Sequence, residues 1–260
     1  MTPTQDYLQK CNTINQVVLK QEPLILRAAQ LFSDSILAGR MVHVFGSGHS
    51  RIMVEEMWPR YGSFPGFNPI VELSLTFHNL VVGANGQRQA MFLENISGLA
   101  ERILRNFDVS NQDSALIISS SGCNIVPIEM AELFQNSGVR VVAVLTKEHS
   151  EKSRSKRSDG KKLGDFADVI LDTGAPVGDA MVYVEGLDTP VSPGSTVGGA
   201  MIINCIKAET ARLLTAAGQP PLVLSGAAVV GEKRAVDLFE RAYDEHAHRL
   251  ARLYENVKQK

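Results

Sequence analysis

Apolar runs and helical periodicities alternate along the 260 residues of the chain. Four short apolar segments have the length and composition of buried strands, and they lie at 41–45, 115–118, 139–145 and 169–171. A fifth segment, 70–75, is half polar and is a further candidate strand. Helical periodicity predicts two helices within the first forty residues, one after the 115–118 strand, and others at 91–107, 200–214 and 232–257.

This alternation determines the expected fold class. Strands separated by helices, without short hairpin turns between them, pair in parallel and carry helices on both faces of the sheet. No internal repeat and no domain-sized linker interrupts the pattern. We therefore predict one doubly wound α/β domain over residues 1–260, with a helical extension at 1–40 and the α/β core and C-terminal helix at 41–260.

Composition and charge narrow the function classes. A net charge of −2 with 21% charged residues does not favour nucleic-acid binding, and the one basic run, 147–162, is interpreted as a solvated, mobile loop. The three cysteines are widely spaced without a CxxC pair, which argues against a disulfide framework or a zinc site. Polar residues interrupt the first twenty positions, and no apolar segment is long enough to cross a bilayer. We expect a cytoplasmic protein that contacts neither nucleic acid nor a membrane.

Two loops rich in serine and glycine, 46–50 and 119–124, each follow a predicted strand and precede a helix. In an open parallel sheet, ligands bind beyond the carboxyl ends of the strands. Glycine lets the backbone approach an anion, and both the first amides of a helix and serine hydroxyls donate hydrogen bonds to it. One such loop is also a common helix cap, but two together favour an anion site. The first loop lacks the third glycine of a dinucleotide fingerprint, since Arg51 stands there, and no Walker lysine follows it.

Four stretches resemble the SIS (sugar isomerase) family of phosphosugar isomerases and phosphosugar-binding domains: GRMVHVFGSGHSR, ALIISSSGCNIVPIEMAE, VRVVAVLTKEHS and PGSTVGGAMIIN. Two further segments, NPIVELSLTFH and LDTGAPVGDA, resemble a largely uncharacterised single-domain branch of that family. The resemblance implies a flavodoxin-like, five-stranded parallel sheet and a phosphosugar held by the two serine loops. It also implies a homodimer or homotetramer with shared active sites, and no metal or other cofactor.

Carried over by position, the resemblance implies a set of phosphate-binding residues in the two loops: Ser47, Gly48, His49, Ser50, Ser119, Ser120, Ser121, Gly122 and Asn124. Ser195 and Thr196 correspond to the polar start of the last core helix, which lines the sugar site in relatives. The alternative interpretation of Ser195 is a plain helix N-cap.

Aldose–ketose isomerisation needs a base that moves a proton between neighbouring carbons, and often an acid that opens the ring. Glu56 is the first candidate, because phosphoheptose isomerases and the etherase acting on N-acetylmuramic acid 6-phosphate carry a functional glutamate on the equivalent helix. A solvated helix face is the alternative interpretation of Glu56. His78 follows the candidate strand 70–75 and is the second catalytic candidate. Glu94, expected to open the helix after His78, and His149 are secondary candidates.

A metal held by His49, His78 and Glu56 is not supported, because no HxH or HExxH spacing is present.

The leading interpretation is an isomerase of a phosphorylated sugar or amino sugar. Three alternatives stay open: an etherase or lyase, suggested by the PGST segment; a phosphosugar-binding regulator without catalysis; and an isomerase of another anionic sugar such as a sulfosugar. Regulators of the family usually carry a helix-turn-helix domain, and the segment before Met41 is too small and too weakly basic for one.

Overall fold

Five strands form one all-parallel sheet in the order β2-β1-β3-β4-β5. The computed structural model of the chain describes residues 1–76, 86–255 and 257. The strands are β1 (Val42–Gly46), β2 (Phe67–Ile70), β3 (Ser114–Ile118), β4 (Arg140–Leu145) and β5 (Val169–Asp172). This sheet confirms the predicted doubly wound α/β fold, and the N-terminal segment is helical as expected.

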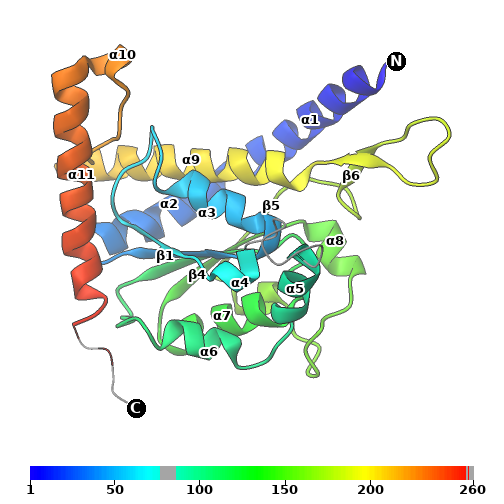
Figure 1. The fold of residues 1–260 in the computed structure, drawn as a ribbon, viewed down its shortest axis with the longest axis horizontal. Coiled ribbons are helices and arrows are strands. Elements are labelled where there is room, and N and C mark those ends of the chain that lie inside the picture. Colours follow the sequence, from blue (N-terminus) through cyan, green and yellow to red (C-terminus); the bar gives the residue numbers. More distant parts are fainter. Residues whose placement is uncertain (77–85, 256, 258–260) are drawn as a thin grey trace.

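Helices cover both faces of the sheet (Figure 1). Alternate residues along a strand point to opposite faces, so Leu116 and Ile118 of β3 join one core cluster while Ala115 and Ile117 join the other. The first cluster is completed by α1 (Pro3–Leu19), α2 (Glu22–Leu37), α3 (Arg51–Met57) and α9 (Ser195–Ala216). The second is completed by α6 (Leu99–Leu104), α7 (Ile125–Asn136) and η3 (Leu163–Phe166).

The predicted limits of two elements, the strand 70–75 and the helix 91–107, were wrong. The candidate strand 70–75 ends as β2 at Ile70, and the short helix α4 (Leu73–Thr76) follows. The Glu72 carboxylate accepts hydrogen bonds from the Ser74 amide (3.2 Å) and hydroxyl (2.8 Å), a local pairing that competes with strand formation.

The predicted helix 91–107 is interrupted. Here α5 (Gly86–Leu93) ends early, and α6 begins only after Gly98, whose φ of +84° places it in the left-handed region. The Asn95 amide group donates to the Met91 carbonyl (2.8 Å), and the Gly98 amide donates to Glu129 of α7 (2.9 Å). Side-chain bonds therefore end one helix and orient the next, although the apolar spacing continues across the break.

A small hairpin was not expected from the sequence. Its strands, β6 (Ala180–Val182) and β7 (Val191–Pro193), pair antiparallel outside the main sheet and extend beside α1 (Figure 1).

The basic run 147–162, predicted to be a mobile loop, has an ordered structure. It begins as α8 (Lys147–Lys152), and Arg157 is fixed by ion pairs with Glu132 (2.6 Å) and Asp159 (2.7 Å).

A buried polar network lies at the amino ends of the strands. The Asp113 carboxylate accepts from Arg40 Nε (2.8 Å) and Nη2 (2.9 Å) and lies 3.2 Å from His43 Nε2. The other ring nitrogen of His43 contacts the Asn68 amide at 3.0 Å. Although burial raises it, hydrogen bonds from His43 and Arg40 lower the pKa of Asp113 to about 2. The network joins β1, β2 and β3 through Asp113 and His43, which are buried, and Arg40, which stays partly accessible to solvent.

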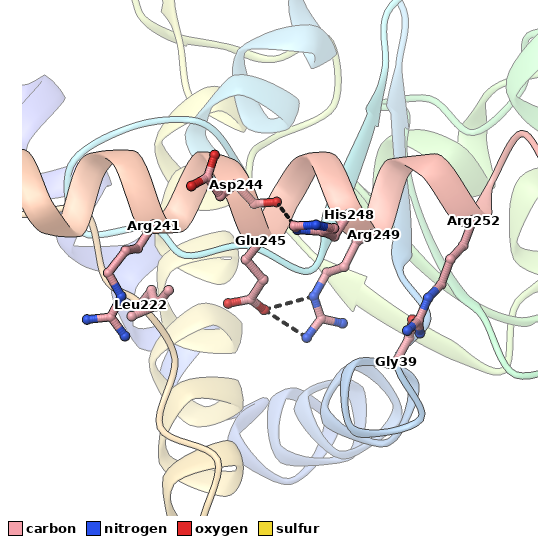
Figure 2. A pocket seen from close by; sticks show the side chains of 8 residues that line it. All are labelled: Gly39, Leu222, Arg241, Asp244, Glu245, His248, Arg249 and Arg252. Carbon is pink, nitrogen blue, oxygen red and sulfur yellow. Dashed lines mark hydrogen bonds and ion pairs between the residues drawn. The ribbon is translucent and has the colours of Figure 1, made fainter.

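The last long helix, α11 (Glu232–Arg252), follows the short α10 (Ala227–Val230). Arg249 donates to the carbonyls of Ile36 and Arg40 (both 3.1 Å) and pairs with Glu245, while Arg252 donates to the Gly39 carbonyl (2.9 Å). Figure 2 shows Glu245, Arg249 and Arg252 of α11 beside Gly39, in the turn after α2. These residues line a hollow of about 470 Å³. None of the described helices combines the length and the apolar character needed to cross a membrane.

Candidate functional site

The sheet order creates a switch point between β1 and β3. The chain moves from β1 outward to β2, then returns to β3 on the other side and continues through β4 to β5. The loops after β1 and β3 diverge at such a point and leave a crevice, where doubly wound proteins bind their ligands. A cavity of about 440 Å³ occupies this position.

Most of the predicted site residues meet in this cavity. Those that line it are Ser47, Gly48, His49, Ser50, Glu94, Ser119, Ser120, Ser121, Asn124, His149, Ser195 and Thr196. Gly122 belongs to the second loop but lies behind the lining, against Leu163 and Leu145. His78 lies outside the described residues.

The first serine loop needs its glycines. A side chain at Gly46 would approach the Ser50 carbonyl oxygen to 2.8 Å, and Gly48 has a φ of +55°. The short 3-10 helix η1 (Gly48–Ser50) follows directly, closed by a hydrogen bond from the Ser50 amide to the Ser47 carbonyl (3.1 Å). The loop therefore turns tightly enough to bring the Ser47 hydroxyl into the cavity at the end of β1.

The second serine loop is braced by its own side chains. The Ser119 hydroxyl accepts from the Gly122 amide, and the Ser121 hydroxyl accepts from the Cys123 amide, both at 3.2 Å. Accepting these bonds leaves each serine its hydroxyl hydrogen to donate. Asn124 occupies the N-cap position of α7, but its side chain forms no cap bond and points elsewhere.

Glu94 connects the two loops. Its carboxylate accepts from the Ser47 hydroxyl (2.6 Å) and from the Asn124 amide group (2.7 Å), while its carbonyl accepts from the Val126 amide (2.9 Å). Burial raises the pKa of Glu94, and the hydrogen bond from Ser47 offsets only part of that rise. Glu94 follows the end of α5 rather than opening a helix, which corrects its expected place. The bend after Leu93 turns its carboxylate between the two loops.

A second carboxylate, that of Asp179, forms the wall near α9. It accepts from the amides of Gly194 (3.1 Å) and Ser195 (2.7 Å) and from the Ser195 hydroxyl (2.9 Å). The helix is thus capped by Asp179, and Ser195 is its first residue rather than its N-cap. Asp179 has a left-handed backbone with φ of +72°. Sequence reasoning missed this residue, and the only signal was the Gly-Asp pair inside LDTGAPVGDA.

Glu56 does not line the cavity. Its carboxylate accepts from the Asn204 amide group of α9 (2.7 Å) and pairs with Arg60, and its carbonyl accepts from Lys207 (2.7 Å). Although burial raises it, hydrogen bonds from Asn204 and Arg60 lower the pKa of Glu56 below its ordinary value. Within one copy of the chain, the Glu56 carboxylate therefore faces α9, and its contacts favour the ionised form.

The set of charged and titratable side chains that line the cavity is unusual for an anion site. Its lining, among the described residues, contains the carboxylates of Glu94 and Asp179 and the imidazoles of His49 and His149, but no lysine or arginine. His149 Nδ1 accepts from the Gly178 amide at 3.2 Å. Over the same described part of the chain, no group of three His, Cys, Asp or Glu is arranged to hold a metal ion. Donors to an anion are therefore hydroxyls, amides and imidazoles.

Comparison with known proteins gives the family. The sequence model of the SIS domain matches residues 6–146. A UPF0309 protein of Halalkalibacterium halodurans is 34% identical over 232 residues, which cover 88% of this chain and 93% of that protein. A UPF0309 protein of a Geobacillus species is 35% identical over 222 residues, covering 85% and 87%. A solved phosphoheptose isomerase from Francisella tularensis is similar over 81% of this chain and 98% of its own, at 14% identity and a TM-score of 0.49. The chain belongs to the SIS domain family and, within it, to the UPF0309 proteins.

Proposed function

We propose that the chain is a phosphosugar isomerase that binds its substrate in the cavity between the two serine loops. The observation that carries this proposal is Glu94, a half-buried carboxylate with a raised pKa that contacts both loops at once. A protein that only binds a phosphosugar has no need of such a group, because its negative charge opposes the ligand. An acid–base catalyst requires it.

In this proposal the phosphate is bound by both loops. Hydroxyls of Ser47, Ser50, Ser119 and Ser121 donate to its oxygens, with Gly48, His49, Ser120 and Asn124 completing the cradle and Gly122 supporting the second loop from behind. The sugar then extends toward Ser195, Thr196 and His149 across the cavity. The volume of about 440 Å³ is sufficient for one phosphorylated sugar.

The chemistry assigned to Glu94 is proton transfer between neighbouring carbons. Its carboxylate removes the proton from C2 of the open-chain aldose, and the electron pair of that bond forms the C1–C2 double bond of an enediolate whose charge lies on O1. The hydroxyl proton of O2 then moves to O1, so that the charge passes to O2. As the carbonyl forms at C2, Glu94 returns its proton to C1, and atoms and charge balance. Glu56 and His78 stay proposed as acid–base residues, with Glu56 acting across an interface between two copies.

Proton exchange in heavy water tests the proposal. A panel of phosphorylated aldoses, ketoses and amino sugars is incubated with the protein, and deuterium at C2 is followed by NMR. Exchange at C2 together with ketose formation is the expected result. Binding without exchange would replace the isomerase with a regulator, and release of a hydroxy acid would replace it with an etherase. A sulfosugar exchanged faster than its phosphate analogue would change the anion and keep the reaction.

Ser121→Ala is expected to weaken phosphosugar binding by about 1–2 kcal/mol, because one hydroxyl donor to a charged oxygen is lost. Titration calorimetry measures the change in affinity. Ser137→Ala is the matched control, since its exposed hydroxyl donates only to the Leu133 carbonyl within α7. Equal affinities of the two variants would remove the second loop from the phosphate site.

A further inference from the structure

One donor of each serine loop already has an acceptor within the chain. The Ser47 hydroxyl and the Asn124 amide group both point at the Glu94 carboxylate, at 2.6 and 2.7 Å. A carboxylate and a phosphate oxygen accept the same kind of hydrogen bond. The Glu94 carboxylate therefore accepts the two hydrogen bonds that the anionic group of a ligand would otherwise accept.

The surroundings give this carboxylate little other support. Burial opposes its charge, and no lysine or arginine is among the described residues that line the cavity. The titratable groups that share the cavity are His49 from η1, His149 from α8 and Asp179 from the loop before β6. The Asp179 charge is already bound to the amino end of α9, so it does not accept from the serine loops.

We propose that Glu94 and the anionic group of the ligand compete for the same two donors, so that anion binding releases Glu94 as a free base. This inference rests on the proposed function and adds how the base becomes active. Before binding, Ser47 and Asn124 stabilise the charged carboxylate. After binding, those donors turn to the ligand, and the carboxylate is left beside a second negative charge.

This competition predicts that the protein takes up a proton when an anion binds. The bound anion raises the pKa of Glu94 above its value in the empty cavity, because the donors are lost and a like charge is gained. The complex therefore takes up a proton when the pH lies between the two values. Affinity for a dianion falls as the pH rises through the higher value and is constant above it.

The test uses inorganic sulfate, which stays a dianion from about pH 5 to about pH 9, so any proton taken up belongs to the protein. Calorimetry in two buffers of different ionisation enthalpy counts the protons bound with sulfate. The wild-type chain is expected to take up a proton near the acidic end of this range and none at the alkaline end. Glu94→Gln is expected to bind sulfate about tenfold more tightly at alkaline pH, since no charge-assisted bond to Glu94 has to be broken.

Two further variants separate Glu94 from its neighbours. His49→Gln is expected to keep the proton uptake assigned to Glu94, whereas Glu94→Gln removes it. Ser47→Ala is expected to lower sulfate affinity less than Ser121→Ala does, because Ser47 loses a bond to Glu94 in the empty site as well as its bond to the anion. A residue with a merely structural role in the loop would not produce this difference.

The outcomes distinguish the two proposals. If sulfate and inorganic phosphate bind neither the wild-type chain nor Glu94→Gln, the anion site itself is refuted and the inference with it. If both proteins bind sulfate with the same affinity and the same proton uptake, the anion site stands and the competition is refuted. Proton uptake that survives in Glu94→Gln and vanishes in His49→Gln would assign the linkage to His49 and overturn the role of Glu94.

Discussion

Glu94→Gln is expected to lower the rate of C2 proton exchange by about 10²–10⁴-fold, the usual contribution of a positioned acid–base group. Glutamine has nearly the same shape and still accepts from Ser47 through its carbonyl oxygen, so the loops keep their positions. It cannot take a proton from carbon. Because the negative charge is also gone, the variant is expected to bind the phosphosugar at least as well as the wild-type chain, so the loss appears in kcat and not in KM.

Two controls make this result specific. Glu148→Gln changes an exposed carboxylate of α8 that pairs with Lys152 (2.6 Å) and is expected to leave exchange unchanged. Glu56→Gln is measured beside it, because sequence resemblance favours Glu56 while the geometry of a single copy favours Glu94. If Glu56→Gln stops exchange and Glu94→Gln does not, the base is supplied by Glu56, and the cavity requires a second copy of the chain.

Asp113→Ala is expected to lower the free energy of unfolding by about 3–5 kcal/mol, since it removes one partner of a buried charge network. Asp113 is almost inaccessible to solvent, and its loss leaves Arg40 and the buried His43 without their acceptor. Urea denaturation followed by circular dichroism measures the change. Asp237→Ala is the control, because Asp237 pairs with Arg241 on the exposed face of α11 and is expected to cost less than about 1 kcal/mol.

The lowered pKa of Asp113 also predicts that the free energy of unfolding decreases at acid pH. The pKa of Asp113 is lowered from 3.8 to about 2 in the folded chain, so the folded state favours the ionised form. This stabilisation amounts to about 2 kcal/mol; it is fully present above about pH 4 and is lost as the pH falls through about 2. Asp113→Asn should remove this part of the acid dependence. If the free energy of unfolding of the variant falls between pH 4 and pH 2 as it does in the wild-type chain, other carboxylates cause the fall.

The central strands could be predicted closely because their burial is complete. Every residue of β1 and β3 is buried, so each strand is mostly apolar apart from His43 in β1 and Ser114 in β3, and the predicted limits agree within one residue. The two loops were equally visible, because a serine and glycine run after such a strand is informative without knowledge of its partners. These features depend on local sequence alone.

The rest depends on contacts between distant segments. The apolar period of 91–107 continues through the break at Gly98, which is made by the local bond from Asn95 to Met91, the left-handed backbone of Gly98 and the bond from Gly98 to Glu129 of α7. Glu56 was placed on the correct helix, but the direction of its side chain is determined by Asn204 of α9, far along the chain. Asp179 acts through amides of Gly194 and Ser195 that no spacing rule connects to it.

The close approach of α9 to the sheet also bears on how the chain is made. Gly198 lies so near Thr173 that a side-chain carbon there would come within 1.9 Å of its carbonyl oxygen, so α9 is seated against the end of β5. On the ribosome, β1, β3 and β4 emerge well before α9. The apolar face of the nascent sheet that includes Val44 and Leu116 is therefore covered only in part, by α1, α2 and α3, until α9 has been synthesised. Chaperone contact during translation is expected to concentrate in that interval and to end when α9 docks.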